Sequence, residues 1–520
     1  MSLAAGAALA DPAAGADPRD AEIARLNALV DRLESRVDNL EARLNAVPPA
    51  APPVATVPSP APAPAPATIA SSAAGGATIL GGKPTIASGD GRFSATLHGV
   101  MQFDTAAYFQ SGAGPLGSDF RRGATNSATD TAHARDLGNG TNFRRARIGV
   151  DGKVFGDFEY NVLFDFGGAG EEDGGHVQEL WVQYSGIKPI HVRVGAFPPS
   201  IGLEDQASTN GAPFLERPAI ADMARSLAGG DFREAAEIWG AGERWYFNAA
   251  VTGRLVGVSN IQGSTVLQPY DSQLGLIGRI AFLPYRDENL LIHVGAHGSY
   301  SVRPADAGGP DTAAGTARYP ITFQERPELR VDGTRLISTG GIDADHASTL
   351  GFEGALQFRN LFIEGEYEQL RIERHNPAAG VVNPTFSGYY VEGTWVLTGE
   401  TRRYNMGTYA FDAPSVDHPF SLQNGTWGGL ELALRYSDAD LNFREGALGT
   451  AISASGVRGG EQRIFAAGLN WYLNSVVRFM FQFQDVTIDR LSPATSFTTP
   501  VGVQIGQHYQ SVAVRSQMAF

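Results

Sequence analysis

The chain has 520 residues, of which 63 are glycine and none is cysteine, and its formal net charge is -15 at pH 7. This excess of negative charge argues against a nucleic-acid partner, because proteins that bind phosphate backbones present a surplus of basic residues. The sequence has no run of about eighteen apolar residues, so it offers no candidate for a membrane-spanning helix.

Residues 1–20 begin with an Ala-rich stretch that ends in Ala8-Leu9-Ala10 before Asp11. This ending resembles the cleavage site of a signal peptide, although no basic residue precedes it. We therefore expect either the remnant of a signal peptide or a disordered tail.

Residues 21–47 carry apolar side chains at alternating spacings of three and four, which is the a/d pattern of a coiled coil. We predict a coiled-coil stalk here, and a single amphipathic helix packed on a domain is the alternative. The next segment, 48–90, is rich in Pro, Ala and Gly and is predicted to be a linker, because repeated Pro removes amide donors and fixes an extended backbone. The apolar positions of the stalk are Ile23, Leu26, Val30, Leu33, Val37, Leu40, Leu44 and Val47.

From residue 91 to 520 the sequence alternates apolar and polar residues in segments of about ten residues, as transmembrane β-strands do. In the last segment Val512 and Val514 share one face, and Arg515 and Gln517 share the other. We predict an all-β protein with an antiparallel transmembrane β-barrel of about 16 strands. The predicted strands cover residues 92–109, 143–152, 156–167, 176–185, 189–197, 234–240, 244–254, 272–283, 289–301, 348–359, 361–373, 386–398, 427–441, 461–473, 476–489 and 506–520.

Short and long links between these strands alternate, which separates periplasmic turns from outer loops and predicts a periplasmic location for both chain ends and for the stalk. The link 399–426 breaks this pattern, because it is long but falls on the side of the short turns. Strand parity predicts that Arg145, Arg147 and Arg193 point into the lumen. Parity also places in the lumen Arg279, Arg435, Arg478, Glu179, Glu353, Glu364, Glu366, Glu368, Glu392 and Glu431.

The segment NFRRAR at 142–147, followed by FGDFEY at 155–160 and LFD at 163–165, resembles two strands of the phosphate-selective porin O and P family. The resemblance implies a homotrimeric porin of sixteen strands whose third outer loop, here about 198–233, folds into the lumen as a constriction. Further matching segments are Arg193-Val-Gly195, Ile201-Gly-Leu-Glu204, Glu216-Arg217, Arg326-Pro-Glu328, Thr339-Gly340, Glu364-Gly-Glu366 and Leu397-Thr-Gly-Glu400 with Arg403.

The resemblance implies that the paired arginines Arg144 and Arg145 line an anion-binding constriction. Family members selective for phosphate carry lysines around the inserted loop, whereas this chain has no lysine after Lys188. A structural alternative is that each lumenal arginine pairs with a neighbouring acid and only neutralises buried charge. The predicted pore and anion-binding residues are Arg144, Arg145, Arg147, Arg193, Arg217, Arg225 and Arg233, and the predicted eyelet acids are Glu204, Asp205 and Glu216.

These features predict a trimeric outer-membrane porin for passive diffusion of small hydrophilic solutes, with a bias toward anions that includes phosphate-like anions. The alternatives are a general or cation-preferring porin, and a structural protein that tethers the envelope and has an incidental pore. The expected partners are two further copies of the chain, outer-membrane lipid, and peptidoglycan or another periplasmic partner for the stalk.

We expect no enzymatic activity and no cofactor or metal. The sequence shows no convergent nucleophile and base, and its 10 histidines are scattered. His293 and His297 fall four residues apart on a predicted strand, about 13 Å from each other, which is too far to share one metal ion.

Overall fold

The computed structural model describes residues 76–80, 83–110, 137–168, 175–230, 233–256, 271–307, 317–493 and 500–520. The chain divides into two units, Met1–Ala70 and Ser71–Phe520, and every described residue belongs to the second unit. The predicted tail 1–20 and the predicted stalk 21–47 lie outside the described residues. In the described part of the chain no helix is long and apolar enough to cross a membrane.

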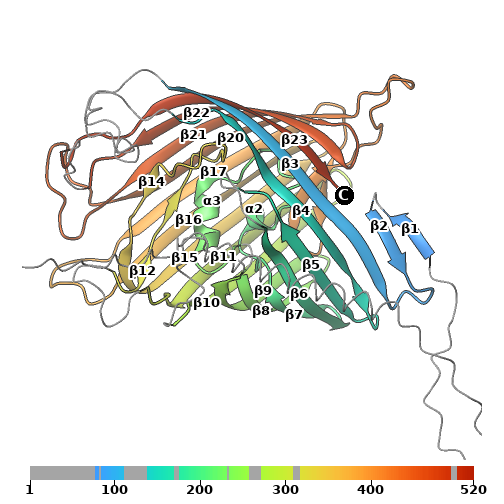
Figure 1. Ribbon diagram of the computed structural model, residues 1–520, viewed down its shortest axis with the longest axis horizontal. Coiled ribbons are helices and arrows are strands. Elements are labelled where there is room, and N and C mark those ends of the chain that lie inside the picture. Colours follow the sequence, from blue (N-terminus) through green and yellow to red (C-terminus); the bar gives the residue numbers. More distant parts are fainter. Residues whose placement is uncertain are drawn as a thin grey trace, which may run out of the picture. The chain divides into compact units, whose positions relative to one another are not determined.

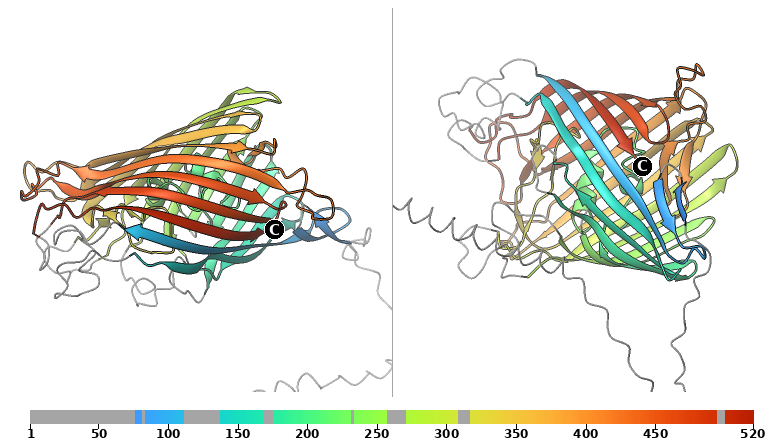
Figure 2. Two further views of the ribbon diagram at one scale, coloured as in Figure 1. Left: turned by 90° about the horizontal axis from the view of Figure 1, so that it is seen from above. Right: turned by 45° about the vertical axis from the view of Figure 1, so that its right-hand side comes forward.

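Sixteen antiparallel strands form a closed barrel, in which each strand pairs with the next along the chain and β23 pairs with β3 (Figures 1 and 2). Each predicted strand overlaps one of them, so the predicted barrel is confirmed. The strands are β3 (Ser94–Gln110), β4 (Gly140–Val154), β5 (Phe158–Asp165), β6 (His176–Ile187), β7 (Ile190–Ala196), β8 (Arg233–Ala241), β9 (Trp245–Leu255), β10 (Leu274–Arg286), β11 (Leu290–Arg303), β15 (Ile342–Phe358), β16 (Leu361–Arg374), β17 (Thr385–Val396), β20 (Gly429–Phe443), β21 (Val457–Tyr472), β22 (Val477–Asp489) and β23 (His508–Ala519).

The barrel strands expose apolar side chains outward and bury polar ones inward. In β16, Ile363 and Tyr367 are exposed, whereas their neighbours Glu364, Glu366 and Glu368 are buried. This arrangement suits a barrel in lipid, because apolar groups meet hydrocarbon outside and charged groups meet water or each other inside. Closure also satisfies the backbone hydrogen bonds of every strand, which a bilayer requires.

Two short strands, β1 (Gly76–Leu80) and β2 (Lys83–Ala87), form a hairpin in the segment that the sequence predicted to be linker. The prediction of a linker as far as residue 90 is therefore wrong for this part. The hairpin extends the barrel sheet because β2 pairs with the beginning of β3, where Thr85 lies opposite Thr96. Its Ile and Thr residues favour strands.

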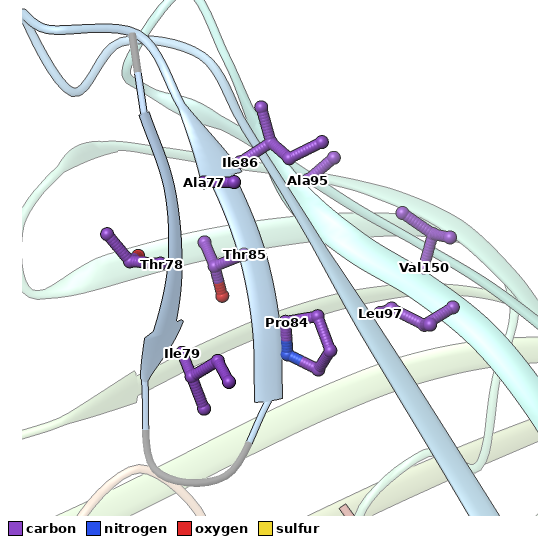
Figure 3. A pocket seen from close by; sticks show the side chains of 9 residues that line it. All are labelled: Ala77, Thr78, Ile79, Pro84, Thr85, Ile86, Ala95, Leu97 and Val150. Atoms are coloured by element: carbon purple, nitrogen blue, oxygen red, sulfur yellow. The ribbon is translucent and has the colours of Figure 1, made fainter.

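The hairpin and the adjoining strands enclose an apolar groove of about 530 Å³ (Figure 3). Leu97 and Val150 in this groove belong to the outward faces of β3 and β4. The groove therefore lies on the outer surface and takes no part in the lumen. Its lining residues are Ala77, Thr78, Ile79, Pro84, Thr85, Ile86, Ala95, Leu97 and Val150.

Two long segments between barrel strands pack against inward-facing side chains. The segment from 197 to 232, called the inner loop below, carries α2 (Leu203–Gln206) and α3 (Ala219–Ser226), which lie within the barrel (Figure 1). The segment 304–341 carries β12 (Pro320–Ile321), β13 (Gln324–Glu325) and β14 (Ile337–Ser338). Residues of both segments share one apolar core with inward-facing residues of the barrel.

The long link on the side of the short turns forms a hairpin of β18 (Arg402–Asn405) and β19 (Ala410–Pro414). Tyr409 in this hairpin is fully buried and donates a hydrogen bond from its hydroxyl to the carbonyl of Gly242 at 2.7 Å. The buried Arg279 donates to the carbonyls of Thr408 and Tyr409 at 2.8 and 2.9 Å. The link is long because it folds into the barrel and binds lumenal side chains.

We predict that Leu434→Arg destabilises the barrel by about 2–4 kcal/mol, because it places a charge on the lipid-facing side of a strand. Leu434 is 56% exposed and lies on β20. Urea titration of folding into lipid vesicles measures the change. Leu434→Ala is the matched control and should cost clearly less, and equal losses for the two variants would contradict a lipid-facing position.

Candidate pore constriction

The inner loop turns at Gly202, where the backbone φ is +88°, a value that glycine adopts without strain. A Cβ atom at this position would lie 2.7 Å from Oε1 of Glu366 on β16. Glycine therefore lets the loop approach the barrel wall closely. The backbone N–H of Leu203 then donates a hydrogen bond to this carboxylate at 2.5 Å.

The carboxylate of Glu216, on the inner loop, is surrounded by four arginines, and we call these five residues the Glu216 cluster. Arg144 donates two hydrogen bonds to it, at 2.7 and 3.0 Å, and Arg515 donates one at 2.7 Å. Arg330 lies 3.4 Å from the carboxylate and Arg145 lies 4.0 Å from it. Burial alone would raise the pKa of Glu216, but the arginines, Arg144 foremost, hold that pKa well below its ordinary value.

A β-bulge in β4 explains how two consecutive arginines reach the same carboxylate. Gln102 of β3 pairs with Arg145, and Phe103 pairs with Phe143, so Arg144 is the extra residue of the bulge. A bulge interrupts strict alternation and redirects a side chain. Strand parity alone assigned Arg145 to the lumen, and the bulge adds Arg144 to the same site.

The other two predicted pore arginines on strands lie outside the Glu216 cluster. Arg147 forms an ion pair with Asp165 at 2.7 Å. Arg193 donates to Gln183 at 3.0 Å and lies over the ring of Trp181 at 4.5 Å. Both side chains therefore have close partners on their own part of the wall.

The three arginines of the inner loop and its end have different roles. Arg225 forms an ion pair with Asp205, one of the predicted eyelet acids. Arg233 donates to three backbone carbonyls at the base of the loop, at 2.9 to 3.3 Å. Arg217 donates to the carbonyls of Glu204 and Asp205, both at 3.3 Å, and forms no ion pair within the described residues.

Two members of the Glu216 cluster were absent from the predicted site. Arg515 also forms a bidentate pair with Asp104, at 2.6 and 2.7 Å, and parity on the last strand already placed it on the polar face. Arg330 also pairs with Asp222 of α3. Arg330 comes from the segment 304–341, which has no strand periodicity from which its direction could be inferred.

Acidic side chains gather where the inner loop meets β16 and β17. Glu204 of α2 lies beside Glu364 of β16 and Glu392 of β17, and all three are buried. Burial raises the pKa of Glu204 well above its ordinary value, and the neighbouring carboxylate of Glu392 raises that pKa further. We call these three residues the acidic trio. The inner loop thus contacts an arginine-rich part of the wall through Glu216 and an acid-rich part of the wall through Glu204.

A small cavity beside the inner loop brings arginines and acids together. Arg145 and Arg217 line this cavity together with Glu204 and Glu216. Its volume is about 10 Å³, which is close to the space that one water molecule requires. Arg145 has no hydrogen-bond partner at its buried Nε.

A second cavity, of about 440 Å³, lies where the strands are joined by short turns. It is lined by Lys83 of the N-terminal hairpin, by Arg403 and Asp412 of the β18–β19 hairpin, and by Arg478 and Phe520. Of these, Arg478 is 2% exposed and donates to the carbonyl of Ala212, on the inner loop, at 2.9 Å. The cavity therefore adjoins residues that contact the inner loop.

We predict that Glu216→Ala destabilises the folded barrel by about 3–5 kcal/mol, because it leaves buried arginines without their shared counter-ion. Urea unfolding of the detergent-solubilised protein measures this loss. Glu243→Ala is the control, because Glu243 is exposed in a short turn, and we expect it to change stability by less than about 0.5 kcal/mol. Equal stability of Glu216→Ala and the unsubstituted protein would show that the cluster does not hold the loop.

Comparison with known proteins places this geometry in context. A family model described as "Phosphate-selective porin O and P" matches residues 114–519. Porin O of Pseudomonas aeruginosa is 25% identical over 372 residues, which cover 67% of this chain and 77% of that protein. An uncharacterized protein of Caulobacter vibrioides is 26% identical over 468 residues, which cover 88% of this chain and 82% of that protein.

Among solved structures, an anion-selective porin from Comamonas acidovorans is 12% identical with a TM-score of 0.46, over 82% of this chain and 100% of that chain. OmpT of Vibrio cholerae, solved in a trimer form, is 9% identical with a TM-score of 0.44, over 82% of this chain and 99% of that chain. Because the family model matches well over half of the sequence, the chain belongs to the phosphate-selective porin O and P family and is an outer-membrane porin channel.

Proposed function

We propose that the chain forms a homotrimeric porin through which small hydrophilic solutes diffuse passively, with a bias toward anions. One observation carries the proposed bias: Arg145 and Arg217 line the same lumenal cavity, and neither has a close ion pair. Of the four arginines in the Glu216 cluster, Arg145 lies farthest from the carboxylate, at 4.0 Å. Within the described residues, Arg217 donates hydrogen bonds only to backbone carbonyls. Within the described residues neither guanidinium donates a hydrogen bond to a carboxylate, so the positive charge of this cavity is only partly neutralised.

Charge at the narrowest point of a pore selects ions by sign. A guanidinium group presents several N–H donors in a plane, which suits the oxygens of phosphate-like anions. The cavity is only about 10 Å³, so an anion that binds between Arg145 and Arg217 would displace side chains of the inner loop.

The acidic trio supports the alternative of a general or cation-preferring porin. Its three carboxylates come from the inner loop and from β16 and β17, two strands that contribute no residue to the Glu216 cluster. Oppositely charged sides would create a transverse field that orients dipolar solutes and weakens selection by sign. A permeant that follows the acid-rich side would be a cation.

The proposed anion bias predicts that the double variant Arg145→Ala and Arg217→Ala lowers the permeability ratio of chloride to potassium. We expect a fall of about fivefold, which corresponds to about 1 kcal/mol of lost Coulomb attraction at a water-like dielectric. The zero-current potential across planar bilayers under a KCl gradient measures this ratio.

The charge-conserving double variant Arg145→Lys and Arg217→Lys should retain the sign of selectivity. Arg254→Ala is a matched control, since Arg254 is exposed and pairs with Glu234 at the far end of β9. Cation selectivity of the unsubstituted channel, or anion selectivity unchanged in the double alanine variant, would support the alternative.

The heptad pattern of 21–47 supports the trimeric part of the proposal, because an a/d seam buries its apolar side chains only by association with other helices. The Pro-rich spacer that follows could extend some 60 Å in a polyproline conformation and so reach into the periplasm. Peptidoglycan or another periplasmic component is the proposed partner of the stalk. A purely tethering role with an incidental pore is the competing proposal.

Deletion of residues 21–67 separates these roles. We expect single-channel conductance to persist, because the barrel closes through β3 and β23 without this segment. The temperature at which the oligomer dissociates in detergent should fall, as measured by gel mobility after heating. Loss of all conductance in a barrel that still folds would show that the pore depends on the stalk.

A further inference from the structure

The acidic trio brings three carboxylate oxygens from separate elements to one place. Glu204 comes from α2 of the inner loop, Glu364 from β16 and Glu392 from β17. One oxygen from each residue lies within 4.8 Å of the other two. The side chains are 2%, 4% and 1% exposed, respectively.

In the part of the chain that the structure describes, each member of the trio has a buried carboxylate oxygen without a hydrogen-bond partner. These atoms are Oε2 of Glu204, Oε2 of Glu364 and Oε1 of Glu392. A buried carboxyl oxygen that makes no hydrogen bond is costly, and three carboxylates this close repel one another when they are ionised. A positively charged group placed between the three carboxylates would offset this repulsion and satisfy these atoms.

The neighbouring arginines supply only part of this charge, and Arg217 donates to the backbone carbonyl of Glu204 at 3.3 Å. Arg402 donates to Glu431 at 2.6 Å. Arg435 is engaged by Glu328 and lies 3.4 Å from only one member of the trio, Glu392. Within the part of the chain that the structure describes, Glu364 forms no ion pair. The site therefore holds more carboxylates than the neighbouring arginines neutralise.

A second group of ligand-type side chains lies nearby, and its atoms are mostly in use. His297 is hydrogen-bonded through both ring nitrogens, to Glu353 at 3.1 Å and to Glu368 at 2.6 Å. Glu366 accepts the N–H of Leu203 and the hydroxyl of Tyr390. This second group needs no added ion to satisfy most of its polar atoms, in contrast to the acidic trio.

We propose that Glu204, Glu364 and Glu392 bind a calcium ion through one carboxylate oxygen each, with water completing the coordination shell. A set of oxygen donors alone selects hard cations such as Ca²⁺ and Mg²⁺. Three oxygens within 4.8 Å of one another can share one Ca²⁺, whose ligands lie about 2.3–2.6 Å from the ion. Mg²⁺ demands near-ideal octahedral geometry and keeps its water, whereas Ca²⁺ accepts irregular ligand sets such as carboxylates from three separate elements.

The bound ion would cross-link the inner loop to two strands of the wall. The Glu216 cluster holds the loop through arginines on its other side, so the calcium site would be a second, ion-dependent anchor. Calcium binding by the acidic trio does not require that the channel prefer anions.

Calcium titration of the full-length protein in detergent, after removal of metals with EDTA, tests the proposal by isothermal calorimetry. We expect one Ca²⁺ to bind per chain, more tightly than Mg²⁺, and to raise the temperature of heat-induced unfolding. The double variant Glu364→Gln and Glu392→Gln should bind Ca²⁺ at least tenfold more weakly, because it keeps the shape of the site and removes two charged ligands.

Glu237→Gln is the matched control, because Glu237 is a buried lumenal carboxylate that has its own partner, Asn248, at 2.9 Å. It should bind calcium like the unsubstituted protein. The change in gel mobility on heating verifies that each variant is folded. Absence of calcium uptake by the unsubstituted protein, tighter binding of Mg²⁺, or unchanged uptake in the folded double variant would each overturn the proposal.

Discussion

The shared carboxylate of Glu216 fixes the inner loop in the barrel. Arg144 and Arg145 reach it from the strand that follows β3, and Arg515 reaches it from the strand that closes the barrel on β3. Arg330 reaches it from the segment 304–341. One anion thus connects both ends of the barrel sheet to two inserted segments. Buried arginines of like charge can gather this closely because the carboxylate between them offsets their repulsion.

The inner loop meets unlike environments on its two sides. Toward β4 and β23 its carboxylate, Glu216, has more positive partners than it has charge. Toward β16 and β17 its carboxylate, Glu204, meets two further acids and forms no ion pair within the described residues. Both carboxylates belong to the inner loop. The ion pairs of Glu216 therefore hold Glu204 in place beside the other two acids. The structure therefore keeps an unfavourable group of acids together, as binding sites commonly do.

The barrel could be predicted from the sequence because each strand carries its own signal, an alternation of two that needs no long-range information. The same alternation correctly placed Glu364 and Glu392 in the lumen. Alternation did not predict the direction of side chains at the β-bulge of β4 or in the segments between strands. The bulge turns Arg144 inward against parity, and the hairpin around Tyr409 enters the barrel because of partners more than one hundred residues away. Arg330 lies in a segment without periodicity, so its direction depends on tertiary contacts alone.

The number of lumenal arginines is a poor guide to selectivity, because most of them are neutralised. Arg147 and Arg225 each form an ion pair with a carboxylate, and Arg233 donates hydrogen bonds to backbone carbonyls at the base of the loop. Around the small cavity, the charge that pairing does not neutralise belongs to Arg145 and Arg217 and to the acidic trio, of which Glu204 lines the same cavity. A cation bound by the trio would cancel part of the negative field and leave the arginine side dominant. The sign of selectivity and the occupancy of that site would then be linked through the inner loop that carries Arg217 and Glu204 alike.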